Sequence, residues 1–279
     1  MLLLNFLGIG ASKSGTTWVH DGLDKHPEIF VPPRKEIHFF SSHFDKGFGW
    51  YERQFRGYSG ESCVGEISPS YAVTPEVPHR IHAWSPDIRL MYFIRNPIAR
   101  IYSQYCMKLR NKNDIVSVNV DLEIDKYLEH GLYYKNLVRF LEYFPRHQIL
   151  VLIFDDLKED PMSFIQEVYS YLDVDSSFIP PTVYSKKNVR KSRPKYDKIY
   201  KLLFSNTRII AHTRLYQKYV RQTGFEDYIY RVLPGRNYPE LSQDKERSLA
   251  EFYFEDLCAL SEWLERDLTY WLRPYLDIT

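Results

Sequence analysis

Short apolar runs alternate with segments of helical periodicity along most of the chain. The apolar runs lie at residues 2–9, 62–67, 89–94 and 149–154 and are rich in β-branched or large side chains. Strands that bury both faces in a parallel sheet have this character. Helical spacing of apolar residues, often with Thr, Asp or Pro at the start, predicts helices at 16–25, 75–84, 97–110, 133–143, 161–172 and about 244–271.

This alternation predicts βαβ units, and therefore a P-loop-like α/β fold with a central parallel sheet flanked by helices on both faces. A chain of 279 residues with 44% hydrophobic content is long enough for one large domain, which we expect to span residues 1–279. Ligands of such sheets bind at the carboxyl ends of strands. The residues that directly follow the runs at 2–9 and 89–94 are therefore the first candidates for ligand binding.

Residues 186–221 depart from this composition, because they hold twelve Lys or Arg against one acid, Asp197. We predict a basic, mostly helical or loop insertion over about 186–230 within the domain. Such an insertion can form a lid over a ligand, a rim for an anionic acceptor or a solvated surface, and charge runs are usually solvated.

Net charge and cysteine content argue against several classes of protein. A net charge of +1 indicates no global attraction to nucleic acid or to an acidic membrane. Three widely spaced cysteines without CxxC spacing favour neither a disulfide framework nor a zinc site. The apolar run at 2–9 lacks a basic n-region and is too short for a signal sequence or an anchor. We expect a cytoplasmic protein without a membrane span, and nothing in the sequence indicates an oligomeric state.

The segment Gly10-Ala-Ser-Lys-Ser-Gly-Thr-Thr17 joins the first predicted strand to the first predicted helix. Its glycines keep the spacing of a Walker loop, but Thr16 stands where the Walker lysine would, and Lys13 lies inside the loop. Backbone N–H groups at a helix N-terminus form an anion site to which Lys13 adds a cation; here they belong to Ser14, Gly15, Thr16 and Thr17. The alternative is an ordinary glycine turn with an exposed lysine.

A second candidate anion site follows the run at 89–94. Arg95 stands at the predicted strand end, and Ser103 lies on the helix that Pro97 begins. Arginine offers a planar fork that suits phosphate oxygens and serine a neutral donor, so this pair can hold a phosphate apart from the first site. Two separate anion sites predict a ligand with phosphate groups at both ends.

Glu36 and His38 are two titratable residues in the segment Lys35-Glu-Ile-His-Phe-Phe40. Glu36 stands among apolar residues, where desolvation would raise the pKa of its carboxyl group toward useful basicity. The alternative is a surface acid paired with Arg34 or Lys35. His38 taken alone is more often a packed, hydrogen-bonded histidine than a catalyst.

Taken together, these motifs resemble those of sulfotransferases that use 3′-phosphoadenosine 5′-phosphosulfate (PAPS). The segments SKSGTT and IRNPIARIYSQY are similar to the two nucleotide signatures of that superfamily. KEIHFF, GEISPSY and GRNYP occur in the order seen in heparan sulfate N- and 3-O-sulfotransferases, and the chain is most similar to bacterial-type members. The resemblance covers most of the chain outside about 190–230.

The resemblance implies transfer of a sulfuryl group from PAPS to an acceptor hydroxyl, with adenosine 3′,5′-bisphosphate (PAP) as the product and no metal required. Lys13 would contact the transferred group, Glu36 would act as general base, and His38 would lie beside it. The nucleotide would be held at its 5′-phosphate by Ser14, Gly15, Thr16 and Thr17, at its 3′-phosphate by Arg95 and Ser103, and under a closing loop by Gly235 and Arg236.

Two departures from the pattern bear on the acceptor. Ile67 and Pro234 stand where heparan sulfate enzymes carry lysine, and the paired cysteines of their closing loop are absent. A carbohydrate hydroxyl is the acceptor that the resemblance favours, while a lipid, a small metabolite or a carrier-bound hydroxyacyl chain stays open.

Two other classes of protein explain part of the sequence. A P-loop kinase or NTPase would explain the glycine loop, but it requires the lysine that Thr16 replaces. A nucleic-acid-binding module would explain the basic stretch 186–221 but not the Glu36 segment.

Overall fold

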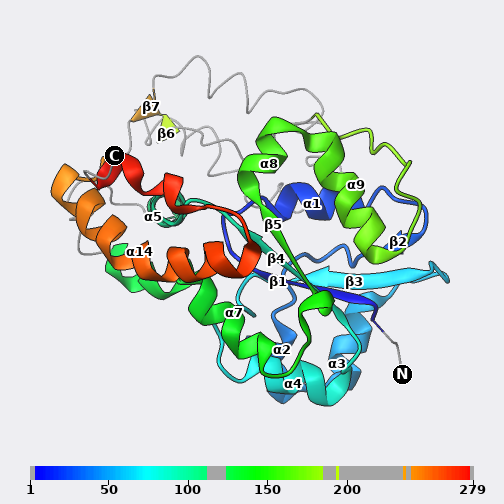
Figure 1. Cartoon of the computed structure of the whole chain (residues 1–279). Helices are drawn as coiled ribbons and strands as arrows, with labels where there is room; N and C mark the ends of the chain where they lie inside the picture. Colours follow the sequence, from blue (N-terminus) through cyan, green and yellow to red (C-terminus); the bar gives the residue numbers. More distant parts are fainter. Residues whose placement is uncertain (1–3, 112–123, 185–192, 195–234, 237–239, 277–279) are drawn as a thin grey trace. The chain divides into compact units, whose positions relative to one another are not determined.

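The computed structural model describes residues 4–111, 124–184, 193–194, 235–236 and 240–276 (Figure 1). The chain divides into two compact units: residues 1–105, 118–187 and 241–279 form the first, and residues 106–117 and 188–240 form the second. The described part of the second unit includes a short antiparallel pair, β6 (Arg193–Pro194) and β7 (Gly235–Arg236). The predicted insertion at 186–230 lies almost wholly outside the described residues, so that division of the domain stays a prediction.

A five-stranded parallel sheet forms the centre of the first unit. Its strands are β1 (Phe6–Gly10), β2 (Ile29–Phe30), β3 (Cys63–Ile67), β4 (Arg89–Ile94) and β5 (Ile149–Ile153), in the spatial order β2-β3-β1-β4-β5. The register pairs Phe6 of the central strand with Gly65 on one side and Arg89 on the other. The predicted parallel α/β fold is confirmed, and the central position of β1 places the loop after Gly10 in the middle of the carboxyl edge of the sheet.

One face of the sheet packs against α1 (Thr16–Leu23) and α9 (Pro161–Leu172), with α8 (Phe154–Glu159) on the same side (Figure 1). Alternate strand residues point to this face because side chains of a strand alternate in direction. The strand residues Phe6, Ile67, Met91 and Phe93 form a buried core with Val19, Leu23, Phe164, Ile165 and Val168 of the helices.

The opposite face is covered by short helices and by α7 (Tyr133–Leu141). Tyr92 of β4 meets Tyr133 edge to face with ring centroids 6.0 Å apart. Asp256 joins α14 (Gln243–Leu264) to α7 by accepting the backbone N–H groups of Tyr134 and Lys135. The other elements on this side are α2 (Phe39–Ser42), α3 (Phe48–Glu52), α4 (Val77–Trp84) and α14 (Gln243–Leu264).

The predicted elements occur with shifted ends, and several short ones were not predicted. Helix α5 (Pro97–Asn111) matches the expected 97–110 closely, since Pro97 opens it and Asn96 accepts the N–H groups of its first turn. The expected helix at 244–271 ends at Leu264, because Glu265 is left-handed with φ 55° and its N–H bonds back to Glu262. β2, α2, α3 and α8 were missed because each is too short to show a period. The 3-10 turns are Phe44–Lys46, Arg53–Phe55, Asp125–Gly131, Arg146–Gln148, Thr269–Trp271 and Arg273–Tyr275.

Candidate active site

The loop between β1 and α1 has a backbone that only particular residues tolerate. Gly15, directly before α1, has φ 90°, and Lys13 has φ 73°. A side chain at Gly10 (φ 154°) would place its Cβ 3.0 Å from the carbonyl oxygen of Pro69 and 2.9 Å from Ala72 Cβ. Glycine is therefore required at both ends of the loop, and the loop curls tightly into the helix N-terminus.

The backbone N–H groups in the first turn of α1 have no side-chain cap. That turn contains no acidic residue, and Gly15 provides no side-chain cap. Ser14 is 1% exposed and Thr16 is 5% exposed, so this part of the loop is shielded from solvent. N–H donors at the positive end of a helix in a desolvated setting suit a phosphate group. Ser14, Gly15, Thr16 and Thr17 thus have the backbone geometry that their expected role requires, and that role stays a prediction.

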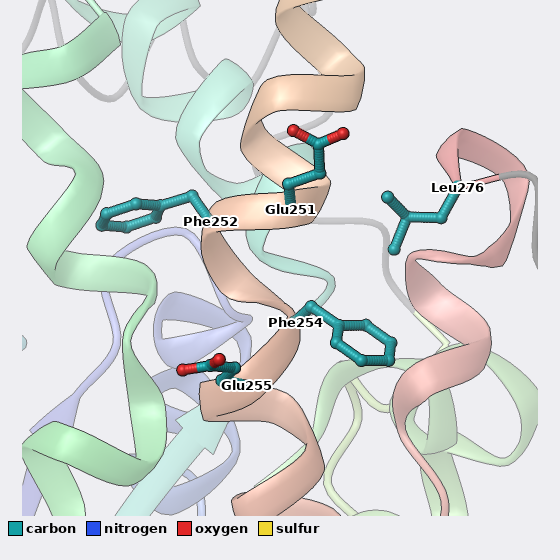
Figure 2. A pocket seen from close by; sticks show the side chains of 5 residues that line it. All are labelled: Glu251, Phe252, Phe254, Glu255 and Leu276. Atoms are coloured by element: carbon teal, nitrogen blue, oxygen red, sulfur yellow. The ribbon is translucent and has the colours of Figure 1, made fainter.

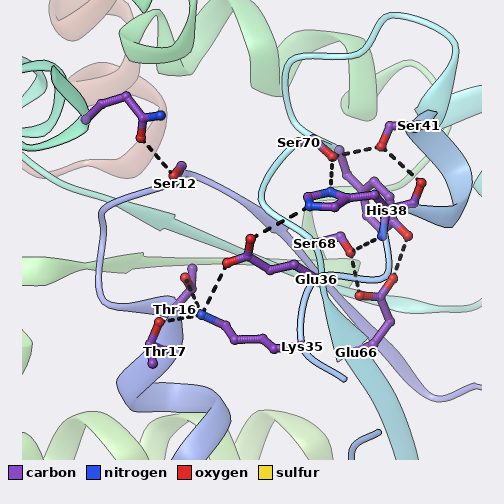
Figure 3. Close-up of polar contacts among 12 residues, drawn as sticks. Ser12, Thr16, Thr17, Lys35, Glu36, His38, Ser41, Glu66, Ser68 and Ser70 are labelled. Atoms are coloured by element: carbon purple, nitrogen blue, oxygen red, sulfur yellow. Dashed lines mark hydrogen bonds and ion pairs between the residues drawn. The ribbon is translucent and has the colours of Figure 1, made fainter. Parts of the chain in front are cut away.

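Lys35 brings an ammonium group to this helix N-terminus, which the sequence did not predict. Its Nζ lies 2.5 Å from Thr17 Oγ1, 3.5 Å from Thr16 Oγ1 and 3.4 Å from Glu36 Oε1 (Figure 3). Burial lowers the pKa of the Lys35 ammonium group, while the nearby Glu36 carboxylate opposes that change. The sequence gave one indication of a role for Lys35, its position next to Glu36, and that position suggested an ordinary surface ion pair.

Glu36 and His38 face each other across a strained turn. Glu36 Oε2 lies 3.7 Å from His38 Nε2, and the two residues have φ values of 61° and 57°. The other ring nitrogen, His38 Nδ1, lies 2.7 Å from Ser70 Oγ, which in turn lies 2.7 Å from Ser41 Oγ. The imidazole is thus oriented by a hydroxyl on one side and by a carboxylate on the other (Figure 3).

The expected rise in the pKa of Glu36 is wrong. Its interaction with His38 is the largest influence and lowers the pKa; burial raises it, and the Lys35 ammonium lowers it again, so the net shift is downward. The side chain of Glu36 is 44% exposed, which weakens the effect of burial. The surface ion pair with Lys35, considered as the alternative, is therefore present as well.

The buried carboxylate of Glu66 is linked to this turn through the hydroxyl of Ser68. Ser68 Oγ accepts the backbone N–H of His38 at 2.8 Å and donates its own proton to Glu66 Oε2 at 2.7 Å. Tyr71 donates to Glu66 Oε1 at 2.5 Å, and Tyr51 lies 3.4 Å from the same oxygen. Burial is the largest influence on Glu66 and raises its pKa to about 7, although the three hydroxyls lower it.

The second predicted anion site lies next to the loop. Arg95 Nη1 donates to the carbonyl oxygen of Lys13 at 3.4 Å, and the guanidinium stacks over the Phe154 ring at 4.7 Å from its centroid. Tyr133 donates its hydroxyl proton to the Arg95 carbonyl at 2.7 Å. Ser103 is half-buried in α5. Beside it, Gln104 Oε1 accepts from Ser12 Oγ of the loop at 3.3 Å. The structure thus places the residues of both signatures close together.

Gly235 and Arg236 form β7 and pair with β6 in the second unit. The side chain of Arg236 lies outside the described part of the structure, so the place of both residues in a loop that closes over a nucleotide stays a prediction.

Three further features of the described residues were compared with this site. A shallow pocket beside α14 is lined by two carboxylates and three apolar side chains, those of Glu251, Glu255, Phe252, Phe254 and Leu276 (Figure 2). Its carboxylates would repel a phosphate. The ranges that the structure describes contain no cluster of three or more His, Cys, Asp or Glu able to hold a metal ion. No helix within them is long and apolar enough to cross a membrane.

Comparison with known proteins assigns the family. A family model, the sulfotransferase domain, matches residues 5–256. Human heparan sulfate glucosamine 3-O-sulfotransferase 5 is 32% identical over 190 residues, which cover 63% of this chain and 53% of that protein. The mouse 3-O-sulfotransferase 6 is 32% identical over 178 residues, covering 59% and 50% of the respective chains. The chain thus spans about half the length of these relatives.

A solved structure shares the fold over almost the whole chain. The sulfotransferase from Alicyclobacillus acidocaldarius superposes with a TM-score of 0.71 at 24% identity, covering 97% of this chain and 99% of the other. A parallel sheet with a glycine loop after its central strand is an α/β architecture whose ligands generally bind at the carboxyl edge of the sheet. The chain belongs to the sulfotransferase domain family, as the resemblance of its motifs predicted.

Proposed function

We propose that this protein is a PAPS-dependent sulfotransferase that transfers the sulfuryl group to an acceptor hydroxyl, with a carbohydrate as the favoured acceptor. One observation carries the proposal: a carboxylate, Glu36, is linked through Lys35 to the hydroxyls of Thr16 and Thr17 at the helix N-terminus. In the proposal, Glu36 is the general base and the start of α1 is the anion site, so that the two lie side by side as in-line transfer between a nucleotide and an acceptor requires.

The loop fits the phosphosulfate group of PAPS. The N–H groups of α1 and the glycine at position 15 allow close approach of the 5′-phosphate, and Lys13 supplies a cation from within the loop. Arg95, bonded to the carbonyl of Lys13, stands where it can reach a second phosphate of the same nucleotide. In the proposal, these residues bind the sulfuryl donor.

The proposed reaction forms one oxygen–sulfur bond and breaks another. The acceptor oxygen attacks sulfur as its proton passes to Glu36, and the bond between sulfur and the 5′-phosphate oxygen breaks. PAP leaves with that electron pair on its 5′-phosphate oxygen, where Lys13 neutralises the growing charge. His38, fixed by Ser70, orients Glu36 or the acceptor hydroxyl.

Two observations support the proposed acceptor class: the names of the relatives, and the isoleucine that stands at position 67 where heparan sulfate enzymes carry lysine. The 3-O-sulfotransferases at 32% identity act, by their names, on the glucosamine of heparan sulfate, which supports a carbohydrate hydroxyl. Ile67 is 1% exposed and packs in the core, so the described site lacks the lysine of that motif. We therefore propose a carbohydrate with fewer sulfate groups than heparan sulfate.

The proposal is tested by supplying radiolabelled PAPS with acceptors of four classes: sugars, lipids, small hydroxylated metabolites and carrier-bound hydroxyacyl chains. Label transfer to a sugar hydroxyl supports the whole proposal, and transfer to another class corrects the acceptor alone. Absence of PAP binding together with Mg²⁺-dependent ATP hydrolysis would favour a P-loop NTPase instead.

A further inference from the structure

Lys35 occupies a position that is electrostatically costly for a cation. Its ammonium lies within 3.5 Å of the hydroxyls of Thr16 and Thr17, the first two residues of α1. The N-terminus of a helix carries a partial positive charge, which repels a cation and attracts an anion. The side chain is only 20% exposed, so water relieves little of this repulsion.

The nearby carboxylates of Glu36 and Asp21 offset the charge of Lys35 only in part. Glu36 Oε1 lies 3.4 Å from the ammonium, a distance of charge attraction longer than a good charge-assisted hydrogen bond. The same carboxylate directs its other oxygen toward His38. Glu36 is also 44% exposed, so this pair is partly screened by solvent. An anion at the helix N-terminus would satisfy both the helix and Lys35.

The position at which heparan sulfate enzymes carry a lysine is filled here by an apolar side chain. Ile67 lies against β1 so closely that a Cβ on Gly8 would stand 2.7 Å from Ile67 Cγ1. Ile67 belongs to the core on the α1 face, together with Val19 of that helix. Lys35 comes from a different segment, but its ammonium reaches the start of the same helix.

We propose that Lys35 binds the sulfuryl oxygens of the donor, exchanging its contact with Glu36 for the sulfuryl group when PAPS binds. This inference rests on the proposed function. The sulfuryl group must lie between the 5′-phosphate at α1 and the acceptor proton taken by Glu36, and Lys35 bridges these two places. Its move removes a positive charge from beside Glu36, which makes the carboxylate a stronger base once the donor is in place.

The proposal predicts that a change at Lys35 affects the affinity for PAPS more than the affinity for PAP, because only PAPS carries the sulfuryl group. Loss of a charge-assisted hydrogen bond costs about tenfold to a hundredfold in affinity. We expect Lys35→Gln to weaken binding of PAPS by about that factor and binding of PAP by less than about threefold. Lys35→Arg keeps the charge and should retain most of the preference for PAPS.

The experiment is a calorimetric titration of each variant with PAPS and with PAP, without acceptor. Lys25→Gln is the matched control, since Lys25 follows the other end of α1, is 48% exposed and pairs with Asp24. Thermal unfolding of all variants verifies the fold. Equal weakening of PAPS and PAP binding, or weakening of neither, would overturn the role of Lys35. Failure of the wild-type protein to bind either nucleotide would instead overturn the proposed function.

Discussion

Glu36 Oε2 and His38 Nε2 lie 3.7 Å apart across a turn in which both residues have positive φ. Non-glycine residues in this region cost about 1 kcal/mol or more each, so the surrounding structure must hold them there. Ser68 does so by accepting the N–H of His38, and Ser70 by bonding its ring. Strain held in this way is characteristic of functional sites, and it points the carboxylate toward the helix N-terminus.

Replacement of the proposed base should reduce turnover while leaving donor binding intact. Glu36→Gln removes the proton acceptor but preserves shape, so we expect kcat to fall about 10²- to 10⁴-fold while PAP affinity changes little. Steady-state rates with the identified acceptor measure this effect. The exposed Glu76→Gln should behave as wild type. Wild-type turnover in Glu36→Gln would reject Glu36 as the base.

Arg95 should determine whether the 3′-phosphate is recognised. Arg95→Ala should weaken PAP binding by about tenfold to a hundredfold and leave binding of AMP, which lacks the 3′-phosphate, nearly unchanged. Because Arg95 also bonds the Lys13 carbonyl, Ser103→Ala provides a milder second variant. Arg56→Ala, at an exposed arginine, is the control. An unaltered ratio of PAP to AMP affinity in both variants would contradict this role.

Gly15 should resist replacement by any residue with a side chain. Its φ of 90° strains an alanine, whose Cβ would also stand 3.0 Å from Phe154 and Leu157 side-chain atoms. We expect Gly15→Ala to lower stability by about 1 kcal/mol or more and to weaken PAP binding, as the loop shifts. Urea unfolding measures the first effect and calorimetry the second. Full stability with unchanged PAP binding would contradict the close fit of the loop.

Glu66 should make stability depend on pH. Its pKa is about 7 in the folded protein against 4.5 ordinarily, so between these values the folded state binds more protons than the unfolded state. Stability therefore falls as pH rises from about 4.5 through about 7, by at most about 3 kcal/mol from this group. We expect Glu66→Gln to lose less stability than wild type between pH 5 and pH 8 in urea unfolding.

The control for Glu66 is the exposed Glu159→Gln, which should follow the wild-type curve. A Glu66→Gln protein with the same change in stability across this pH range as wild type would show that the carboxylate does not titrate there.

The sequence predicted the parallel sheet because its strands are buried on both faces and therefore apolar throughout. The resemblance of the KEIHFF segment to a sulfotransferase motif indicated Glu36 and His38, whose roles stay predictions. The sequence did not predict Lys35 at the helix N-terminus, because that contact depends on a left-handed turn at Glu36 that no local pattern specifies. The pKa of Glu36 was misjudged for the same reason: its neighbours, rather than its burial, control it.

The central claim is that the loop between β1 and α1 binds a nucleotide of the PAPS type. A calorimetric titration of the wild-type protein with PAP tests it most directly, with ATP and Mg²⁺ titrated in parallel. We expect saturable binding of PAP at one site and much weaker binding of ATP. No binding of PAP up to millimolar concentration, or a preference for ATP with Mg²⁺, would contradict it.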